Sequence, residues 1–398
     1  MPGNKIVAVT GHSGFSWHTG HPPLRRHETN RPGAANGMRA FSGMTFMRIN
    51  PVMAGRCWRA LLMGLLGFAC VGAGNGRAED RVRQPTAIQF SFDRPIDASA
   101  APFVLAAADG LFGTEGLAVT TNIANGSPDA IARVATGSSD LALVDINALI
   151  RFHDKAAAPP VKAVFVLFNA APYAIVARKS RGIRALSDIE GKTLGVAEGD
   201  LSIRLWPALA RRNGIKPATV KQERIGAAVR EPMLSAGQVD AVSGFSYLSA
   251  VNLRDRGVPA DDLAVLRYAD YGCEAYGFAV IVNPAFAAAK PEAVKGFLRA
   301  VIASTHATIQ DPARATDEVV SRMEDGSRDL ELERLRIVIR DNILTGEVHR
   351  NGIGGLDPAR LDRSIDQIAE GFEFQKRPSA ADIFDDAFLP PLGDRLIN

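Results

Sequence analysis

Hydrophobic and polar positions follow two periods along the chain, and these periods alternate. Residues 86–92 show the two-residue period of a β-strand, and residues 98–109 form an alanine-rich helical stretch that ends at a glycine. Further strands are expected at 117–123, 141–144 and 161–167, with a helix at 129–135. This alternation predicts an α/β fold with a largely parallel sheet.

The same alternation starts again about 100 residues later. Strands are expected at 193–196, 220–225 and 241–243, with helices at 202–213 and 231–236. A glycine after a strand, a glycine after a helix and an aspartate before a strand each recur at a spacing of 100 residues. We therefore expect two similar, Rossmann-like lobes. The matched pairs are Gly126 and Gly226, Gly137 and Gly237, and Asp140 and Asp240.

Two apolar, extended segments bracket the second repeat, at 170–176 and 276–282. Crossing strands of this kind join the halves of a two-lobed protein and permit closure around a ligand. We expect lobe 1 at 79–174 plus 278–398 and lobe 2 at 175–277. Four late segments have apolar residues at helical spacing, and these helices should pack on lobe 1. They are 291–309, 313–323, 330–343 and 358–371.

The amino terminus has the pattern of an export signal. Residues 1–46 are rich in Gly, Pro and His and show no period, which suggests a non-native or disordered extension. In 47–78, arginines precede a short apolar run and then small residues, which predicts a signal peptide cleaved after Ala78 and a periplasmic protein. Lipid attachment at Cys70 is a competing interpretation. The candidate translation starts are Met44, Met47 and Met53.

Removing this segment changes the charge of the chain. The 398 residues carry a net charge of +3, but the first 78 hold nine basic residues and one acidic residue, so the remainder is at −5. Nucleic-acid binding needs an excess of clustered Lys and Arg, so we expect no nucleic-acid partner. A hydrophobic content of 46% excludes a disordered body. Only Cys273 survives cleavage, so no internal disulfide can form.

Several short motifs together resemble a known family. They read Ala-Pro-Phe at 101–103, Asp-Gly-Leu-Phe at 109–112, Glu-Gly-Leu-Ala-Val at 115–119, Leu-Ser-Asp-Ile-Glu-Gly-Lys at 186–192 and Ala-Gly-Gln-Val-Asp-Ala at 236–241. Their order resembles the substrate-binding proteins of ABC importers in the nitrate, sulfonate, taurine and thiamine-pyrimidine group, which includes NMT1/THI5-like and SsuA-like proteins.

The resemblance implies a type II periplasmic binding fold, with two lobes that close on a small-molecule ligand. It also implies delivery of that ligand to an inner-membrane ABC permease with its ATPase. A monomer without cofactor or metal is expected.

The ligand site is expected beyond the carboxyl ends of the strands, where ligands of open α/β sheets bind. In particular, residues 145–147 and 245–247 should face one another across a cleft, because each segment begins five residues after a matched aspartate. The candidate ligand-binding residues are Phe92, Asp93, Arg94, Asn125, Gly126, Ser127, Asp145, Asn147, Glu198, Asp200, Ser202, Phe245 and Tyr247.

The charges and aromatic residues at these positions bear on the class of ligand. Glu198 and Asp200 would repel an anion in a closed cleft, whereas aromatic rings could stack on a planar ligand. A neutral or cationic heteroaromatic molecule, such as a pyrimidine vitamin precursor, is therefore the leading hypothesis. If Arg94 or Arg230 lines the cleft, a sulfonate, nitrate or carboxylate remains an alternative. The loop 125–129 puts backbone N–H groups and the Ser127 hydroxyl at a helix start, which suits an anion or a carbonyl oxygen, but Ser127 could equally be an ordinary helix cap.

Motifs for catalysis are missing from the sequence. There is no Gly-x-Ser-x-Gly, Walker loop, His-Glu-x-x-His or cysteine pair, so we expect the chain not to be an enzyme. One enzyme alternative is the pyrimidine-precursor synthase of the same fold, which the resemblance links to an active-site histidine and to iron near a cysteine-rich run missing here. A ligand-sensing subunit of a signalling receptor is a further alternative.

Overall fold

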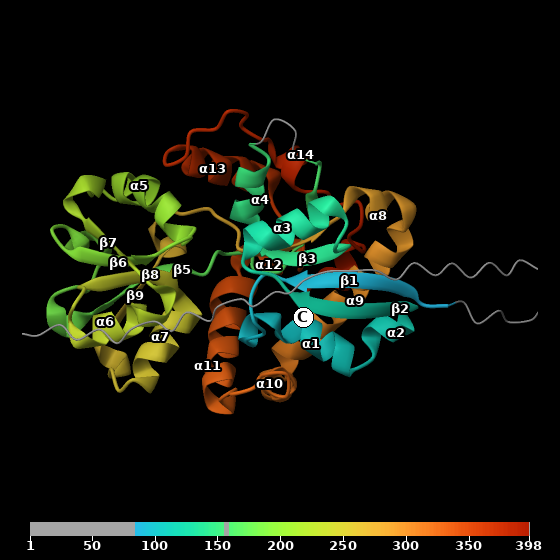
Figure 1. The fold of residues 1–398 in the computed structure, drawn as a ribbon, viewed down its shortest axis with the longest axis horizontal. Helices are drawn as coiled ribbons and strands as arrows, with labels where there is room; N and C mark the ends of the chain where they lie inside the picture. Colours follow the sequence, from blue (N-terminus) through green and yellow to red (C-terminus); the bar gives the residue numbers. More distant parts are fainter. Residues whose placement is uncertain (1–83, 155–158, 398) are drawn as a thin grey trace, which may run out of the picture. The chain divides into compact units, whose positions relative to one another are not determined.

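The computed structural model describes residues 84–154 and 159–397, which contain two five-stranded mixed sheets. The first sheet has the order β2-β1-β3-β10-β4, and Figure 1 labels its strands β1, β2 and β3. Its strands β1, β2 and β3 are parallel, whereas β10 runs antiparallel to both of its neighbours. The strands are β1 (Thr86–Phe92), β2 (Leu117–Ile123), β3 (Leu141–Asp145), β4 (Lys162–Val166) and β10 (Phe278–Val282).

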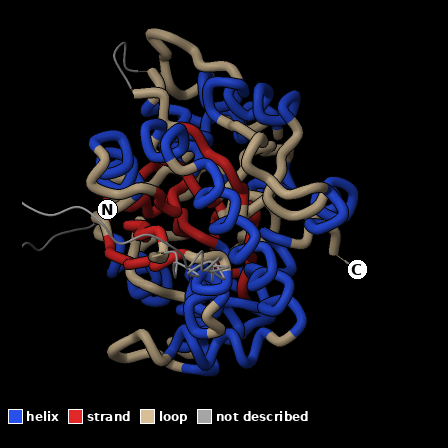
Figure 2. The backbone as a smooth tube through the Cα atoms, turned by 90° about the vertical axis from the view of Figure 1, so that its right-hand side faces the viewer, coloured by secondary structure: helices blue, strands red, loops and turns tan. Residues whose placement is uncertain are grey.

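The second sheet repeats this topology in the order β7-β6-β8-β5-β9. Here β6, β7 and β8 are parallel, and β5 is antiparallel to β8 and β9. Helices surround the strands, as Figure 2 shows. The strands are β5 (Tyr173–Arg178), β6 (Thr193–Ala197), β7 (Lys221–Ile225), β8 (Ala241–Phe245) and β9 (Leu263–Arg267).

The α-helices fall into three groups along the chain. The first repeat contains α1 (Ala101–Ala108), α2 (Leu111–Thr114), α3 (Ser127–Thr136) and α4 (Ile146–Phe152). The second contains α5 (Ser202–Arg212), α6 (Arg230–Ala236) and α7 (Ser246–Asp255). The late helices are α8 (Pro284–Ala289), α9 (Pro291–Gln310), α10 (Pro312–Val320), α11 (Arg328–Val338), α12 (Gly346–Asn351), α13 (Pro358–Ala369) and α14 (Ala380–Ile383). No helix of this described part is long and apolar enough to cross a membrane.

Residues 100 positions apart make the same hydrogen bonds and adopt the same turns in the two sheets. The Asp140 carboxylate accepts a hydrogen bond of 2.7 Å from the Gln89 N–H, and the Asp240 carboxylate accepts one of 2.8 Å from the Thr193 N–H. Each aspartate thus ties the start of its strand to the neighbouring parallel strand. Glycines 137 and 237 both end a helix at φ 79°, where an L side chain would be strained. Only the pair Gly126 and Gly226 differs, because φ is 86° at the first and −66° at the second.

The two connections between the sheets run beside each other. The Ala171 N–H donates to the Ala275 carbonyl at 3.0 Å, and the Gly277 N–H donates to the Phe168 carbonyl at 2.8 Å. One connection leads into β5 of the second sheet, and the other leads back into β10 of the first. The predicted fold class, two α/β lobes joined by two hinge strands, is therefore confirmed.

The late helices cover the first sheet and also reach the second repeat. Helices α9 and α10 pack against α1, as expected. Beyond that expectation, α11 packs along α7, and α13 lies against α5. The precise lobe boundaries stay predictions, and the predicted extension and signal peptide at 1–78 lie outside the described residues.

Gly277 offers a test of how tightly the hinge is packed. A Cβ at this position would lie 2.8 Å from the Phe168 Cβ and 3.2 Å from the Ala171 Cα, inside the other connection. We expect Gly277→Ala to lower the free energy of unfolding by about 1–3 kcal/mol, because overpacking forces backbone shifts. Urea denaturation measures this loss. The matched control is Gly113→Ala in α2, where a Cβ meets nothing within 4 Å. Equal stabilities of the two variants would contradict the close approach.

Candidate functional site

A cavity of about 570 Å³ opens between the loops that follow the strands of the two sheets. This volume lies within the range of small-molecule sites in proteins. From the first sheet come the segments after β1, β2 and β3, and from the second come the loop after β6 and the end of β8. The lining residues, hereafter the cleft residues, are Asp93, Arg94, Pro95, Ala124, Asn125, Gly126, Ser127, Pro128, Asp145, Ala197, Glu198, Gly199, Asp200, Leu201, Ala227, Arg230, Gly244, Phe245 and Leu248.

Nine of the thirteen candidate residues line this cleft. They are Asp93, Arg94, Asn125, Gly126, Ser127, Asp145, Glu198, Asp200 and Phe245. The other four lie behind its wall. Phe92 is buried against Phe90 and Phe103, and Tyr247 is buried against Phe168.

The remaining two candidates support acidic residues of the cleft. The Asn147 side chain donates to the Asp145 carboxylate at 2.8 Å, and the Ser202 hydroxyl donates to the Asp200 carboxylate at 2.6 Å. Both side chains are buried. In both cases a residue two positions after an aspartate donates back to the carboxylate of that aspartate, and so it does not line the cavity.

In the first lobe, a carboxylate, a guanidinium and a hydroxyl form one cluster. Arg94 donates twice to Asp93, at 2.8 and 2.9 Å, and the Ser127 hydroxyl donates to Asp93 at 2.5 Å. Burial alone would lower the pKa of Arg94, but the adjacent Asp93 carboxylate more than offsets this and raises it. Ser127 is therefore not a helix cap, because its hydroxyl serves Asp93 and accepts from the Asp145 N–H at 3.1 Å.

The second lobe repeats this cluster with different residues. The Asp200 carboxylate accepts from the Ser202 N–H at 2.9 Å and from the Ser243 hydroxyl at 2.5 Å. The guanidinium of Arg230 lies 3.8 Å from Asp200 and donates to the Ser243 carbonyl at 2.8 Å. Both arginines of the cleft are thus held by a carboxylate of their own lobe.

Asp145 lies at the inner end of the cleft and connects it to the hinge. Its carboxylate accepts a hydrogen bond of 2.5 Å from the Tyr173 hydroxyl, at the start of β5. Asn147 donates both to Asp145 and to the Tyr276 carbonyl, at 2.7 Å, in the returning connection. Complete burial raises the pKa of Asp145 to about 6, although the bonds from Tyr173 and Asn147 act in the opposite direction.

The balance of charge in the cleft is negative. Four carboxyl groups line it against two guanidinium groups, and each guanidinium is paired with one of them. Asp145 is engaged by Tyr173 and Asn147, so Glu198 is the only cleft carboxylate with no side-chain hydrogen bond or ion pair to another described residue. Glu198 is also exposed. The cleft therefore offers one free negative charge and no free positive charge from the described side chains.

Sequence reasoning missed the apolar part of the lining and the role of Tyr173. Pro95, Leu201 and Leu248 give the cleft a partly apolar surface. No periodicity marks the loop residues Pro95 and Leu201, and Leu248 lies in α7, which was not predicted. Tyr173 begins a crossing strand whose apolar character was recognised, but its partner Asp145 is 28 residues away in the sequence. Trp206 is fully buried in the core and offers no stacking surface to a ligand.

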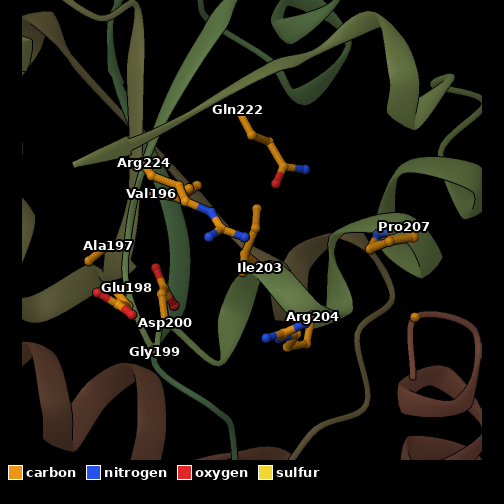
Figure 3. Close-up of a pocket in the computed structure, with 11 residues that line it drawn as sticks. Val196, Ala197, Glu198, Gly199, Asp200, Ile203, Arg204, Pro207, Gln222 and Arg224 are labelled. Carbon is orange, nitrogen blue, oxygen red and sulfur yellow. The ribbon is translucent and has the colours of Figure 1, made fainter. Parts of the chain in front are cut away.

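A second hollow of about 330 Å³ shares the loop 197–200 with the cleft. In Figure 3, Gln222, Arg224 and Ile203 border this hollow, and Glu198 and Asp200 lie on its other side. The loop 197–200 therefore separates the cleft from this second hollow. Within the described ranges, no group of three or more His, Cys, Asp or Glu side chains is arranged to hold a metal ion.

The raised pKa of Asp145 predicts a pH-dependent contribution to stability. The folded chain keeps this proton up to about pH 6, whereas the ordinary carboxyl value is 3.8. The protonated carboxyl therefore makes its full contribution to the free energy of unfolding below pH 3.8. This contribution falls by about 3 kcal/mol as the pH rises through 6. Asp145→Asn lacks this titration, so urea denaturation between pH 4 and pH 7 should show the variant gaining stability relative to wild type as the pH rises.

Tyr173→Phe is the companion variant. It removes a hydrogen bond that lowers the pKa of Asp145, so the fall in stability should extend to higher pH than in wild type. A difference between Asp145→Asn and wild type that stays constant across this pH range would contradict the assignment.

Comparisons with known proteins agree with this fold. The family model described as NMT1/THI5 like matches residues 97–315. Among solved structures, the alkanesulfonate-binding protein SsuA from Xanthomonas axonopodis bound to MOPS has a TM-score of 0.57 at 16% identity, covering 76% of this chain and 99% of that one. The nitrate-binding protein NrtA from Synechocystis has a TM-score of 0.57 at 11% identity, covering 77% and 87%. At these identities the likeness establishes the fold alone.

Curated relatives carry two kinds of name. A 4-amino-5-hydroxymethyl-2-methylpyrimidine phosphate synthase from Schizosaccharomyces pombe is 26% identical over 58% of this chain and 68% of its own length. A synthase of the same name from Legionella pneumophila is 30% identical, over 44% and 56%. The riboflavin-binding protein RibY from Chloroflexus aurantiacus is 30% identical, over 54% and 61%. The chain thus spans between about half and about two thirds of the length of these relatives.

These comparisons correct one expectation and confirm another. The expectation that the chain is not an enzyme is contradicted, because several relatives at 26–30% identity are named as synthases. Missing catalytic motifs do not exclude an enzyme, because many active sites have no short sequence motif. The resemblance drawn from the short motifs is confirmed, because the family model covers more than half of the sequence. The chain belongs to the NMT1/THI5-like family.

Proposed function

We propose that the cleft binds a small heteroaromatic molecule of the pyrimidine kind, in a neutral or cationic form. The observation that carries this proposal is the state of the charges in the cleft. Glu198 is free to accept from an amino group or a protonated ring nitrogen, whereas Arg94 and Arg230 are already engaged by Asp93 and Asp200.

Planar side chains also line the cleft. The Arg94 guanidinium lies 4.3 Å from the centre of the Phe278 ring and 4.8 Å from that of Phe245. Arg94 and Phe245 both line the cleft, and Phe245 also stacks with Tyr173 and Tyr247, so a bound heteroaromatic ring would contact the parts of Arg94 and Phe245 that these neighbours leave uncovered. The nine candidate residues that line the cleft, together with Arg230 and Leu248, form the proposed binding site.

An anionic ligand is the less favoured alternative. Sulfonates and nitrate would need unpaired donors, but the N–H groups of Asn125 and Gly126 donate to the Asp129 carboxylate and the Asp93 carbonyl. Such a ligand would also enter a cleft whose carboxyl groups outnumber its guanidinium groups. The names of the relatives favour the same choice, since the synthases and the riboflavin-binding protein all handle a nitrogen heterocycle.

Two roles fit a cleft of this kind. In the first, the chain is the periplasmic solute-binding component of an ABC importer and hands the ligand to an inner-membrane permease with its ATPase. The fold shared with ligand-binding components of import systems supports this role. In the second, the chain synthesises a pyrimidine phosphate, and the names of its relatives support this role.

Substitution of Glu198 tests the charge argument. We expect Glu198→Gln to weaken binding of 4-amino-5-hydroxymethyl-2-methylpyrimidine by about tenfold, equivalent to about 1.4 kcal/mol, because it removes the charge that receives the ligand's N–H. Isothermal titration of the full chain measures this, with riboflavin, taurine and nitrate as competitors. The control is Glu324→Gln, an exposed carboxylate outside the cleft. Tight binding of taurine or nitrate, with none of the pyrimidine, would overturn the proposal.

A growth experiment separates the two roles. The full chain is expressed, with and without a cognate permease, in a bacterial strain that cannot make the pyrimidine. Growth without added pyrimidine supports synthesis. Growth that needs trace pyrimidine and the permease supports import.

A further inference from the structure

A third cavity, of about 560 Å³, lies at the hinge. Asn169 and Ala170 come from the connection into β5, and Gly272, Cys273 and Glu274 come from the connection back into β10. Arg212 at the end of α5, Arg350 in α12 and Arg360 in α13 complete the wall. This hinge cavity shares no lining residue with the cleft, so the two cavities are separate sites.

One wall of the hinge cavity is a rigid polar frame. Arg360 donates to the Asn169 side chain at 3.0 Å, to its carbonyl at 2.8 Å and to Glu347 at 2.9 Å. The Arg360 guanidinium also lies 4.0 Å from the centre of the Tyr276 ring. Thr345 adds a hydroxyl bond of 2.6 Å to Asn169. These contacts tie the wall together within the chain itself.

The charges of the hinge cavity are the reverse of those in the cleft. Its two carboxylates are neutralised, Glu347 by Arg360 at 2.9 Å and Glu274 by Arg363 at 2.8 Å. Arg212 and Arg350 make no side-chain hydrogen bond or ion pair with another described residue. Burial raises the pKa of the Cys273 thiol to about 11, so this group adds no negative charge near neutral pH. Two free guanidinium groups therefore border one polar cavity.

We infer that the hinge cavity binds a small dianion, such as a phosphate or a short dicarboxylate, between Arg212 and Arg350. Guanidinium groups recognise the oxygens of such anions with paired, charge-assisted hydrogen bonds. The two arginines belong to different parts of the fold. Arg212 ends α5 of the second repeat, whereas α12 packs through Val348 into the core of the first sheet.

A dianion held by both side chains would therefore restrain the angle between the lobes. It could affect the cleft through the hinge and through α5, which runs from Ser202 beside the cleft to Arg212. Because the two sites share no lining residue, a negative result at the hinge cavity would not contradict the proposed pyrimidine site. Likewise, a negative result at the cleft would not contradict the anion site.

Titration with inorganic phosphate and with succinate tests the inference on the full chain. We expect wild type to bind at least one of the two, and Arg212→Ala and Arg350→Ala each to weaken binding by about tenfold. The controls are Arg256→Ala and Arg322→Ala, which remove exposed guanidinium groups that likewise have no partner among the described residues. These variants should change affinity by less than about twofold. Binding of phosphate alone or of succinate alone identifies the preferred dianion.

Alkylation of Cys273 locates the bound ion independently. This half-buried thiol lines the hinge cavity, so saturating phosphate or succinate should slow its reaction with a maleimide by about fivefold, as followed by peptide mass spectrometry. An unchanged Cys273 rate would overturn the inference. So would an absence of binding up to about 10 mM, or an equal loss of affinity in all four arginine variants.

Discussion

The buried carboxyl of Asp145 is the point on which the cleft and the hinge both depend. It receives the Tyr173 hydroxyl from the connection into the second sheet, and through Asn147 it is linked to the carbonyl of Tyr276 in the returning connection. Its own N–H is bonded to Ser127, which in turn holds Asp93 in the cleft. A buried carboxyl is stable only when such donors satisfy it, so the positions of both connections and of the cleft floor are set together.

The pairing of each arginine within its own lobe explains how a cleft with two guanidinium groups can favour a neutral or cationic ligand. Asp93 and Asp200 occupy corresponding places, one after β1 and the other after β6, and each holds a serine hydroxyl at 2.5 Å. Counting arginines in the sequence therefore overstates the positive charge that a ligand would meet. What matters is the charge left after internal pairing, which is negative in the cleft and positive at the hinge.

The sequence predicted the architecture well because the architecture has a local signature. Strand and helix periods, and glycine and aspartate at the same turns, are properties of short windows, and most predicted elements agree with the structure to within a few residues. Strand β9 and the short helices α2, α8, α12 and α14 were not predicted, and neither were helices α4 and α7. The two helices begin directly after a strand, at Ile146 and Ser246, with no loop to mark the change. The candidate site was harder, because the direction of a side chain such as Phe92 or Tyr247 depends on distant packing partners.

The contacts of the late helices bear on how the lobes can move. Helix α11 meets α7 through Arg254 with Glu333 and Arg334 with Asn252, and the end of α13 meets α5 through Arg211 with Glu370. Arg211 and Glu370 are both solvent-exposed, and an exposed ion pair contributes only up to about 1 kcal/mol. The hinge bonds of Asp145 are buried and would leave an unsatisfied carboxyl if broken. The Arg211–Glu370 contact should therefore separate at a lower cost in free energy than the hinge bonds of Asp145.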